Sequence, residues 1–277
     1  MTQGLESHTD ALQALAASSG IGFGLTELDL AIRGCRLGDL SLIAGPPHGG
    51  KTQLAMHLAL HAPEKRLLWF TPDESHGFLL QKLAAIHLGL AQHEVEALAK
   101  TAAGMQRLSC FTANLSNLKV SESGDSSEVK KAIESAVRGW GAAPQALVFD
   151  YADLLTHPMG ETRMEAKMDY FKRLGKELGA AMVVIHQAIK AGMRDQGTPS
   201  LADMDTAGHK QATLVLWTRR TPTPRPSDVL REKLHPTMEV WVLKNKWQPM
   251  RPVEPIVLSL QAGGLLKGKA VDTHLHH

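Results

Sequence analysis

The sequence has few cysteines, no excess of one charge and no long hydrophobic run. Its 277 residues include two cysteines, Cys35 and Cys110, which are too few for a disulfide framework and are typical of a reducing compartment. With 30 Lys and Arg against 28 Asp and Glu, any polyanion must be bound by a local patch. No run reaches the ~18 apolar residues that span a bilayer, and no signal peptide is recognisable. We therefore expect a cytoplasmic protein that has no contact with a membrane.

Short apolar runs alternate with helical stretches along most of the chain. The runs bounded by charge predict buried strands at 40–44, 66–71, 146–149, 181–186 and 213–218. The intervening periodic stretches predict helices at 51–61, 77–88, 129–140 and 161–178. This alternation predicts an α/β fold with a mostly parallel central sheet flanked by helices. Two late runs, 239–243 and 255–260, predict antiparallel strands.

The remaining segments predict a short N-terminal helix, a linker and two loops. Residues 9–18 predict the helix, which is too short to be stable alone, so we expect residues 1–19 to form a linker and oligomerisation helix. The glycines of 20–24 predict a hinge-like linker, followed by a leucine-spaced turn at 25–32. Residues 121–128 predict an exposed loop, and the proline-rich segment 219–226 predicts a protruding one.

A phosphate-binding motif lies between the first predicted strand and the helix after it. The segment GPPHGGKT, residues 45–52, fits the pattern GxxxxGK[ST] in its required context. Lys51 is expected to reach the β- and γ-phosphates of ATP, and Thr52 to ligate Mg²⁺. The predicted nucleotide-binding residues are Gly45, His48, Gly49, Gly50, Lys51 and Thr52. The competing interpretation is an ordinary glycine turn.

Acids follow two of the other predicted strands, at the edge where ligands of open α/β sheets bind. Asp150 ends the run ALVFD and is the predicted Walker B acid for the metal, whereas Asp153 is expected to cap a turn or face solvent. Asp73 and Glu74 follow the strand 66–71, and one of them can orient and deprotonate the attacking water. The alternatives are a plain strand end for Asp150 and helix capping for the pair.

Gln187 follows the strand 181–186 in the same way, and its amide could touch the γ-phosphate. The four motifs, in this order, resemble the RecA-fold ATPase core of DnaB-type replicative helicases and RadA/Sms recombination ATPases. The segment GFGLTELDLAIRGCRLGDLSLIAGPPHGGKT is similar to the family phrase TGxxxLDxxxxGxxxGDLxxIxxxPxxGKT, with Phe23 in place of the opening Thr. The resemblance covers about 20–260 and implies a RecA-like P-loop NTPase core at 20–265, with a C-terminal tail at 266–277.

The resemblance also implies roles for the strand-end residues. The segment TPDES is similar to a family strand end that carries a catalytic Glu, so Asp73 takes that position, or Glu74 takes the role. LVFDYADLL resembles the Walker B phrase and VVIHQ the sensor, which implies these roles for Asp150 and Gln187.

The segment Lys244-Asn-Lys-Trp247 resembles the KNRFG of RadA and the KQR of DnaB. There an Arg finger reaches a neighbouring subunit's nucleotide, and here Lys246 stands in its place, with the charge but without the planar fork. A solvated basic strand end is the alternative, and the next candidates for the finger are Arg219, Arg220 and Lys244.

The resemblance therefore implies an ATP-hydrolysing DNA helicase or translocase that forms a ring, a hexamer by analogy, and acts in DNA replication or recombination on single-stranded or forked DNA. Loops at 156–163 and 189–210 would face the channel, and the basic residues predicted to bind DNA are Arg163, Lys190, Arg194 and Lys210. The alternatives for these residues are solvated charges. The alternatives for the protein are a recombination or repair ATPase that does not unwind DNA, and a nucleotide-switched assembly protein.

Overall fold

One mixed sheet runs through the computed structural model, which describes residues 20–187, 197–204, 207–220, 237–248, 252, 254–264 and 266–268. Its strands are β1 Leu40–Gly45, β2 Leu67–Phe70, β3 Leu118–Ser121, β4 Ala146–Phe149, β5 Ala181–Gln187, β6 Leu214–Arg220, β7 Thr237–Asn245, β8 Ile256–Leu260 and β9 Leu266–Gly268. The α-helices are α2 Thr26–Ile32, α3 Lys51–His61, α4 His76–Leu88, α5 Gln92–Ala99, α6 Ala102–Asn114, α7 Ser126–Trp140 and α8 Met164–Leu178. The predicted α/β fold with a mostly parallel sheet is thereby confirmed.

The strand order in the sheet is β3-β2-β4-β5-β1-β6-β7-β8-β9. The six strands from β3 to β6 are parallel, and β7, β8 and β9 continue the sheet in antiparallel pairing. The central strand β1 pairs with β5 on one side and β6 on the other, with Gly45 in register with Gln187. The carboxyl ends of the parallel strands consequently meet at one edge, on either side of the segment that follows β1.

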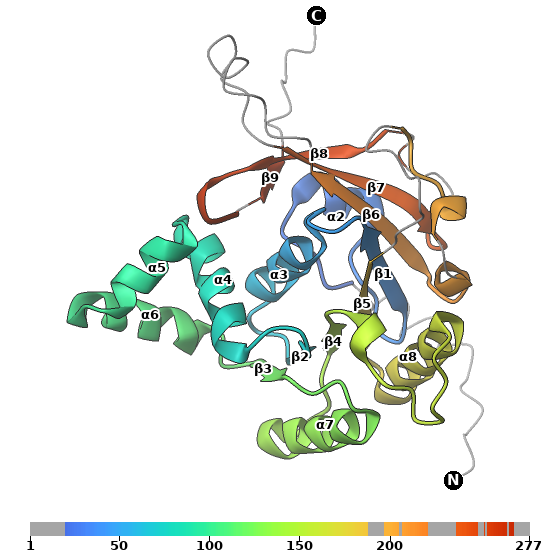
Figure 1. Ribbon diagram of the computed structural model, residues 1–277, viewed down its shortest axis with the longest axis horizontal. Helices are drawn as coiled ribbons and strands as arrows, with labels where there is room; N and C mark the ends of the chain where they lie inside the picture. Colours follow the sequence, from blue (N-terminus) through green and yellow to red (C-terminus); the bar gives the residue numbers. More distant parts are fainter. Residues whose placement is uncertain are drawn as a thin grey trace, which may run out of the picture.

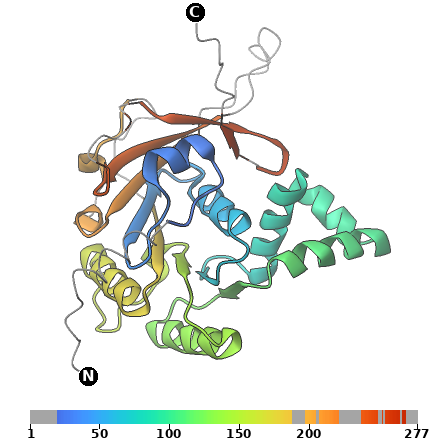
Figure 2. The same cartoon turned by 180° about the vertical axis from the view of Figure 1, so that it is seen from behind.

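Helices cover both faces of the sheet (Figures 1 and 2). On one face, α2, α3 and α4 pack against a core that includes Leu28, Leu54 and Leu83, and on the other face α7 and α8 pack against a core that includes Ile133 and Phe171. Neighbouring strand residues enter opposite cores, as period-2 alternation requires. No helix in these described ranges has both the length and the apolar character that crossing a membrane requires.

The segment at residues 20–24 is part of the domain core, so the prediction of a hinge-like linker is wrong. Ile21 forms a β-bridge with Cys35, and Phe23 is fully buried. The carboxylate of Asp29 accepts hydrogen bonds from the backbone N–H of Phe23 at 2.7 Å and of Leu25 at 3.1 Å. These bonds hold the segment against α2, which replaces the predicted turn at 25–32.

Other boundaries shift because local caps decide them. Asp125 caps α7, accepting from the N–H of Ser127, so the helix begins at Ser126 inside the predicted loop at 121–128. The helix predicted from 161 begins at Met164. Arg219 and Arg220 belong to β6 rather than to a protruding loop. The helix predicted at 9–18 lies outside the described residues, as do 221–226.

Two helices and an edge strand occupy a stretch for which the sequence predicts no elements. The helices α5 and α6 stand at one side of the body in both views (Figures 1 and 2), and β3 follows them as the outermost parallel strand. Each helix buries few residues, Val95 on α5 and Gly104 with Phe111 on α6. This small buried face explains why the apolar period is weak in the sequence.

A stack of three phenylalanines lies beneath the carboxyl end of β4. The Phe70 and Phe149 rings are 4.7 Å apart and nearly parallel, and Phe171 of α8 lies 4.5 Å from Phe149. All three side chains are buried. Because Phe149 immediately precedes Asp150, this stack supports the point at which β4 delivers its carboxylate.

Removal of the central ring should be costly. We expect Phe149→Ala to lower the free energy of unfolding by about 3–5 kcal/mol, because a large cavity would remain between two rings. Urea unfolding followed by circular dichroism measures this. The matched control is Phe78→Ala, since Phe78 is 40% exposed, and it should cost well under half as much. Equal losses for the two variants would contradict the importance of the stack.

Candidate functional site

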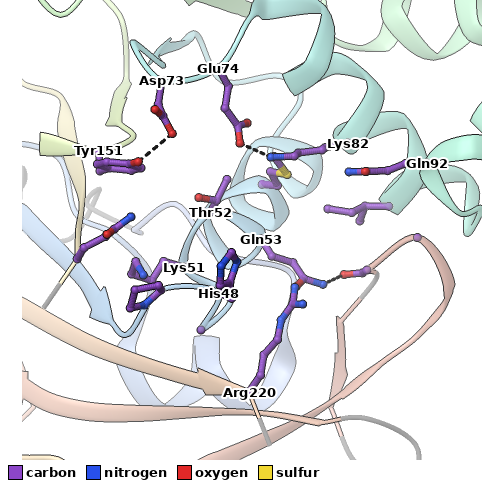
Figure 3. Close-up of a pocket in the computed structure, with 18 residues that line it drawn as sticks. His48, Lys51, Thr52, Gln53, Asp73, Glu74, Lys82, Gln92, Tyr151 and Arg220 are labelled. Atoms are coloured by element: carbon purple, nitrogen blue, oxygen red, sulfur yellow. Dashed lines mark hydrogen bonds and ion pairs between the residues drawn. The ribbon is translucent and has the colours of Figure 1, made fainter. Parts of the chain in front are cut away.

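A cavity of about 410 Å³ lies at the carboxyl edge of the parallel strands, over the turn between β1 and α3 (Figure 3). The turn packs closely against β6, because a Cβ on Gly45, whose φ is +153°, would overlap the carbonyl oxygen of Thr218. Gly50 has φ +91° and precedes the first residue of α3. Both positions favour glycine, Gly45 because a Cβ has no room and Gly50 because its φ is positive. The turn predicted from GxxxxGKT is therefore present in the structure. Of the predicted binding residues, Gly45 lies at its base and the other five line the cavity, as His48, Gly49, Gly50, Lys51 and Thr52.

Lys51 lies almost fully buried against its own loop. Its Nζ donates to the carbonyl oxygens of Gly45 at 3.1 Å and Pro46 at 2.6 Å. Burial lowers the pKa of Lys51 to about 8 from its ordinary value of 10.5, although the negative charge of Asp150 opposes this shift. The ammonium is thus held at the mouth of the turn by neutral oxygens.

Thr52 and Asp150 meet at the end of β4. The Thr52 hydroxyl donates to Oδ1 of Asp150 at 3.1 Å, and Asp150 is only 4% exposed. Burial raises the pKa of this carboxyl from 3.8 to about 7, with the hydrogen bond from Thr52 opposing the rise and the nearby charge of Glu74 adding to it. The hydroxyl oxygen of Thr52 and a carboxylate oxygen of Asp150 therefore lie next to each other beside the phosphate-binding turn.

Asp73 and Glu74 both line the cavity, and each has a different partner (Figure 3). The Tyr151 hydroxyl donates to Oδ2 of Asp73 at 2.8 Å. Glu74 forms a close ion pair with Lys82 of α4. The N-cap of α4 is Ser75, whose hydroxyl accepts from the N–H of Phe78 at 3.3 Å, so the capping role considered for the two acids belongs to their neighbour.

Gln187 ends β5 beside Gly45 and lines the same cavity. The preceding residue, His186, is buried, and its Nδ1 lies 3.0 Å from Oδ2 of Asp153. Asp153 therefore joins the β5 end to the turn after β4. The residue is exposed, with 39% of its side chain accessible, so the expectation that it faces solvent is confirmed, and the contact with His186 is an additional one. The sensor position thus lies beside the phosphate-binding turn.

The predicted residues that lie away from the cavity and its turn are basic. Lys246 is exposed just after β7, where its backbone N–H donates to the Thr213 carbonyl at 3.0 Å. Arg163 is exposed and pairs with Glu161 at 3.0 Å, and Lys210 is exposed at the end of the 3₁₀ turn Ala207–Lys210. Lys190 and Arg194 lie outside the described residues. The structure therefore does not bring Lys246, Arg163 or Lys210 together with Lys51.

Several residues that line the cavity were not predicted from the sequence to belong to it. They include Gln53, Lys82, Gln92, Tyr151 and Arg220, together with the glycine turn formed by Gly263 and Gly264. The sequence contains a signal for two of them. Gln53 directly follows the GKT of the phosphate-binding motif, and Arg220 ends an apolar strand, as Gln187 does, whereas Asp150 directly follows one. The glycine turn comes from a distant part of the chain and carries no such signal.

Asp150 should give the nucleotide-free protein a pH-dependent stability. Its pKa is about 7 in the folded chain against an ordinary 3.8, so its contribution to stability is fully present below the lower value and is lost as pH rises through the higher one. Asp150→Asn, which stays neutral, should flatten this fall and raise the melting temperature above neutral pH. Melting temperatures measured across about pH 5 to 8 test this, and an unchanged profile would contradict it.

Solved proteins share this fold. The fold is similar to a solved chain that is described as an ATPase domain, with a TM-score of 0.74 and 18% sequence identity over 96% of this chain and 100% of that one. It is also similar to the chain described in "The Structure Of A DnaB-Like Replicative Helicase And Its Interactions With Primase", with a TM-score of 0.71 and 17% identity over 95% of this chain and 67% of that one.

At these identities the structural matches show the fold. No curated protein matches the sequence significantly. A family model does match: the DnaB-like helicase C terminal domain, over residues 20–257. That match spans most of the 277 residues, and the chain therefore belongs to the family of DnaB-like helicase C-terminal ATPase domains.

Proposed function

We propose that this chain hydrolyses ATP at the cavity beside Lys51 and uses the energy to move along or unwind DNA as a ring of identical subunits. The family is that of a helicase NTPase domain, and one observation carries the assignment of the site. A single cavity is lined by the phosphate-binding turn, the acids Asp73 and Glu74, and Gln187, with Asp150 hydrogen-bonded to Thr52 beside it.

The donor set at Thr52 and Asp150 fits Mg²⁺. A hydroxyl and a carboxylate oxygen 3.1 Å apart are hard oxygen donors of the kind that this ion takes together with phosphate oxygens and water. When bound, the ion neutralises charge on the β- and γ-phosphates. Ionised Asp150 supplies the negative charge at this point, and Thr52 orients it.

Lys51 and the helix α3 are placed to bind the phosphates. The N-terminus of α3 and the amides of the preceding turn favour an anion, and the Lys51 ammonium can exchange two neutral carbonyl partners for charged phosphate oxygens. The ammonium is attracted more strongly to a negatively charged phosphate oxygen than to a neutral carbonyl oxygen. We therefore assign Lys51 to charge stabilisation in the transition state and Gln187, beside Gly45, to contact with the γ-phosphate.

We assign water activation to Asp73. Tyr151 donates to one oxygen of this carboxylate at 2.8 Å, which orients the group toward the cavity, whereas Glu74 is engaged by the ammonium of Lys82. The shorter side chain of Asp73, relative to the Glu of the resembling families, is thus positioned by a tyrosine from the neighbouring strand end. Proton transfer to this carboxylate would activate the attacking water.

The position of Lys246 favours a role at a neighbouring subunit's site. β7 runs antiparallel to β6, with Met238 opposite Arg220 at the cavity end and Asn245 opposite Leu214 at the other end. Lys246 follows Asn245 and so lies roughly 20 Å from its own cavity, the length of that strand pair. We propose a hexameric ring in which Lys246 reaches the next nucleotide and residues 1–19 fasten adjacent subunits.

DNA is the proposed partner. Arg163 and Lys210 are exposed, and exposed lysine and arginine can contact backbone phosphates. The ATPase rate with and without single-stranded DNA, with particle mass measured by light scattering, tests the function as a whole. DNA stimulation in a multi-subunit particle supports it. Lys51→Ala should abolish turnover, whereas Lys131→Ala, a change at an exposed lysine of α7, should not.

Two outcomes would redirect the assignment. Hydrolysis that is indifferent to DNA would favour a nucleotide-switched assembly protein. DNA-stimulated hydrolysis without strand separation on a forked duplex would favour a recombination or repair ATPase.

The two candidate bases can be separated by isosteric substitution. We expect Asp73→Asn to reduce kcat by at least about 100-fold while nucleotide binding persists, because general base catalysis contributes this much. Glu74→Gln should reduce it far less. Steady-state ATPase assays and binding of a fluorescent ADP measure both. The reverse order would transfer the role to Glu74, and equally mild effects would remove it from both.

The Lys246 finger makes a prediction about mixed rings. Lys246→Ala should lose ATPase activity although its own site still binds nucleotide, since the missing charge belongs to the neighbour's site. Mixing it with inactive Lys51→Ala should restore part of the activity, because some interfaces then pair an intact P-loop with an intact Lys246. Full activity of Lys246→Ala rings, measured by the same ATPase assay, would rule the finger out.

A further inference from the structure

The cavity continues beyond the phosphate-binding turn, away from the acids. In the sheet order, β4 and β5 lie on one side of β1 and β6 lies on the other. Asp150 and Gln187 therefore stand on one side of the turn, and Arg220, the last residue of β6, stands on the opposite side and lines the cavity. Figure 3 shows the Arg220 side chain extending from the sheet toward Gln53.

Gln53 links Arg220 to the glycine turn. Nη2 of Arg220 donates to Oε1 of Gln53 at 2.5 Å, and Nε2 of Gln53 forms a close hydrogen bond with the carbonyl oxygen of Gly264. The turn is pressed against α4, since a Cβ on Gly263 would overlap the Ala85 carbonyl oxygen. One amide thus holds the guanidinium at the far end of the cavity.

The charge of Arg220 meets no carboxylate among the residues that the structure describes. The neighbouring Arg219 differs, because its guanidinium pairs with Glu239 at 2.6 Å. Burial lowers the pKa of Arg220, and no charged group contributes to that shift. A cation that is exposed to the cavity and held by a neutral amide gains from an anionic ligand, because its attraction to a full negative charge exceeds its attraction to an amide dipole.

The positions of the acids orient a bound nucleotide. Thr52 and Asp150 mark the metal end, where the β- and γ-phosphates lie, and Asp73 marks the attacking water. A triphosphate that lies along the turn with its γ end toward β4 and β5 has its α-phosphate and nucleoside toward β6. Arg220 is the cation at that end, 3.7 Å from the position of a Cβ on Gly50.

We propose that Arg220 binds the α-phosphate of the nucleotide in its own subunit and that the nucleotide replaces Gln53 as its partner. This inference rests on the proposed ATP site at Lys51. It assigns Arg220 to binding rather than to hydrolysis, because the α-phosphate is present in substrate and product alike. It also separates Arg220 from Lys246, whose proposed contact is the γ-phosphate of another subunit's nucleotide.

The test is the affinity of Arg220→Ala for ADP and for a non-hydrolysable ATP analogue, measured by calorimetry on the full chain. We expect both affinities to fall by a similar factor of about ten, the loss typical of a hydrogen bond to a charged group. The matched control is Arg219→Ala on the same strand, which should bind both nucleotides as the unchanged protein does. Melting temperatures confirm that both variants are folded, and Arg220→Lys should show an intermediate loss.

Three outcomes would overturn the inference or locate the failure elsewhere. Unchanged affinities in Arg220→Ala would overturn it. A loss confined to the ATP analogue would also overturn it, because the contact would then be to the γ-phosphate. Absence of nucleotide binding in the unchanged protein, or binding unaffected by Lys51→Ala, would instead contradict the proposed ATP site on which it rests.

Discussion

The site depends on burying opposite charges at one edge of a parallel sheet. The same desolvation raises the pKa of Asp150 to about 7 and lowers that of Lys51 to about 8, so each group is pushed toward its neutral form. Neutral partners hold both side chains: the Thr52 hydroxyl for the acid and two loop carbonyls for the lysine. In the proposed site, a phosphate anion with a divalent cation would supply the charges that these buried groups lack, and in a low dielectric that exchange is strongly favourable.

Three consecutive residues at the end of β4 connect the core to this chemistry. Phe149 lies between the rings of Phe70 and Phe171, Asp150 reaches Thr52, and Tyr151 reaches across to Asp73. A rigid stack below the strand end fixes where the next two side chains begin. The position of the Asp73 carboxylate, which follows β2, is therefore linked, through Tyr151, to the packing of β4.

The sequence predicted the central strands and the motifs at their ends because buried parallel strands leave continuous apolar runs. It failed at 20–24, where glycines indicated a hinge but the Asp29 carboxylate holds Phe23 and Leu25 in the core. It also gave no elements for α5 and α6, whose small buried faces leave little periodicity. The contact of Asp153 with His186 was missed for a related reason, since His186 lies on a strand that is distant in sequence.

The sequence by itself determined the local chemistry. The motif GxxxxGKT forms a phosphate-binding turn between a strand and a helix, and acids or an amide follow apolar runs and so lie at the carboxyl edge of the sheet. Only the tertiary structure decided which of these ends become neighbours. The order β4-β5-β1-β6 separates Asp150 and Gln187 from Arg220 across the turn, and the packing of the glycine turn after β8 against α4 brings Gly264 to Gln53. Strand order is set by how helices cover both faces of the whole sheet, a packing problem that no single segment encodes.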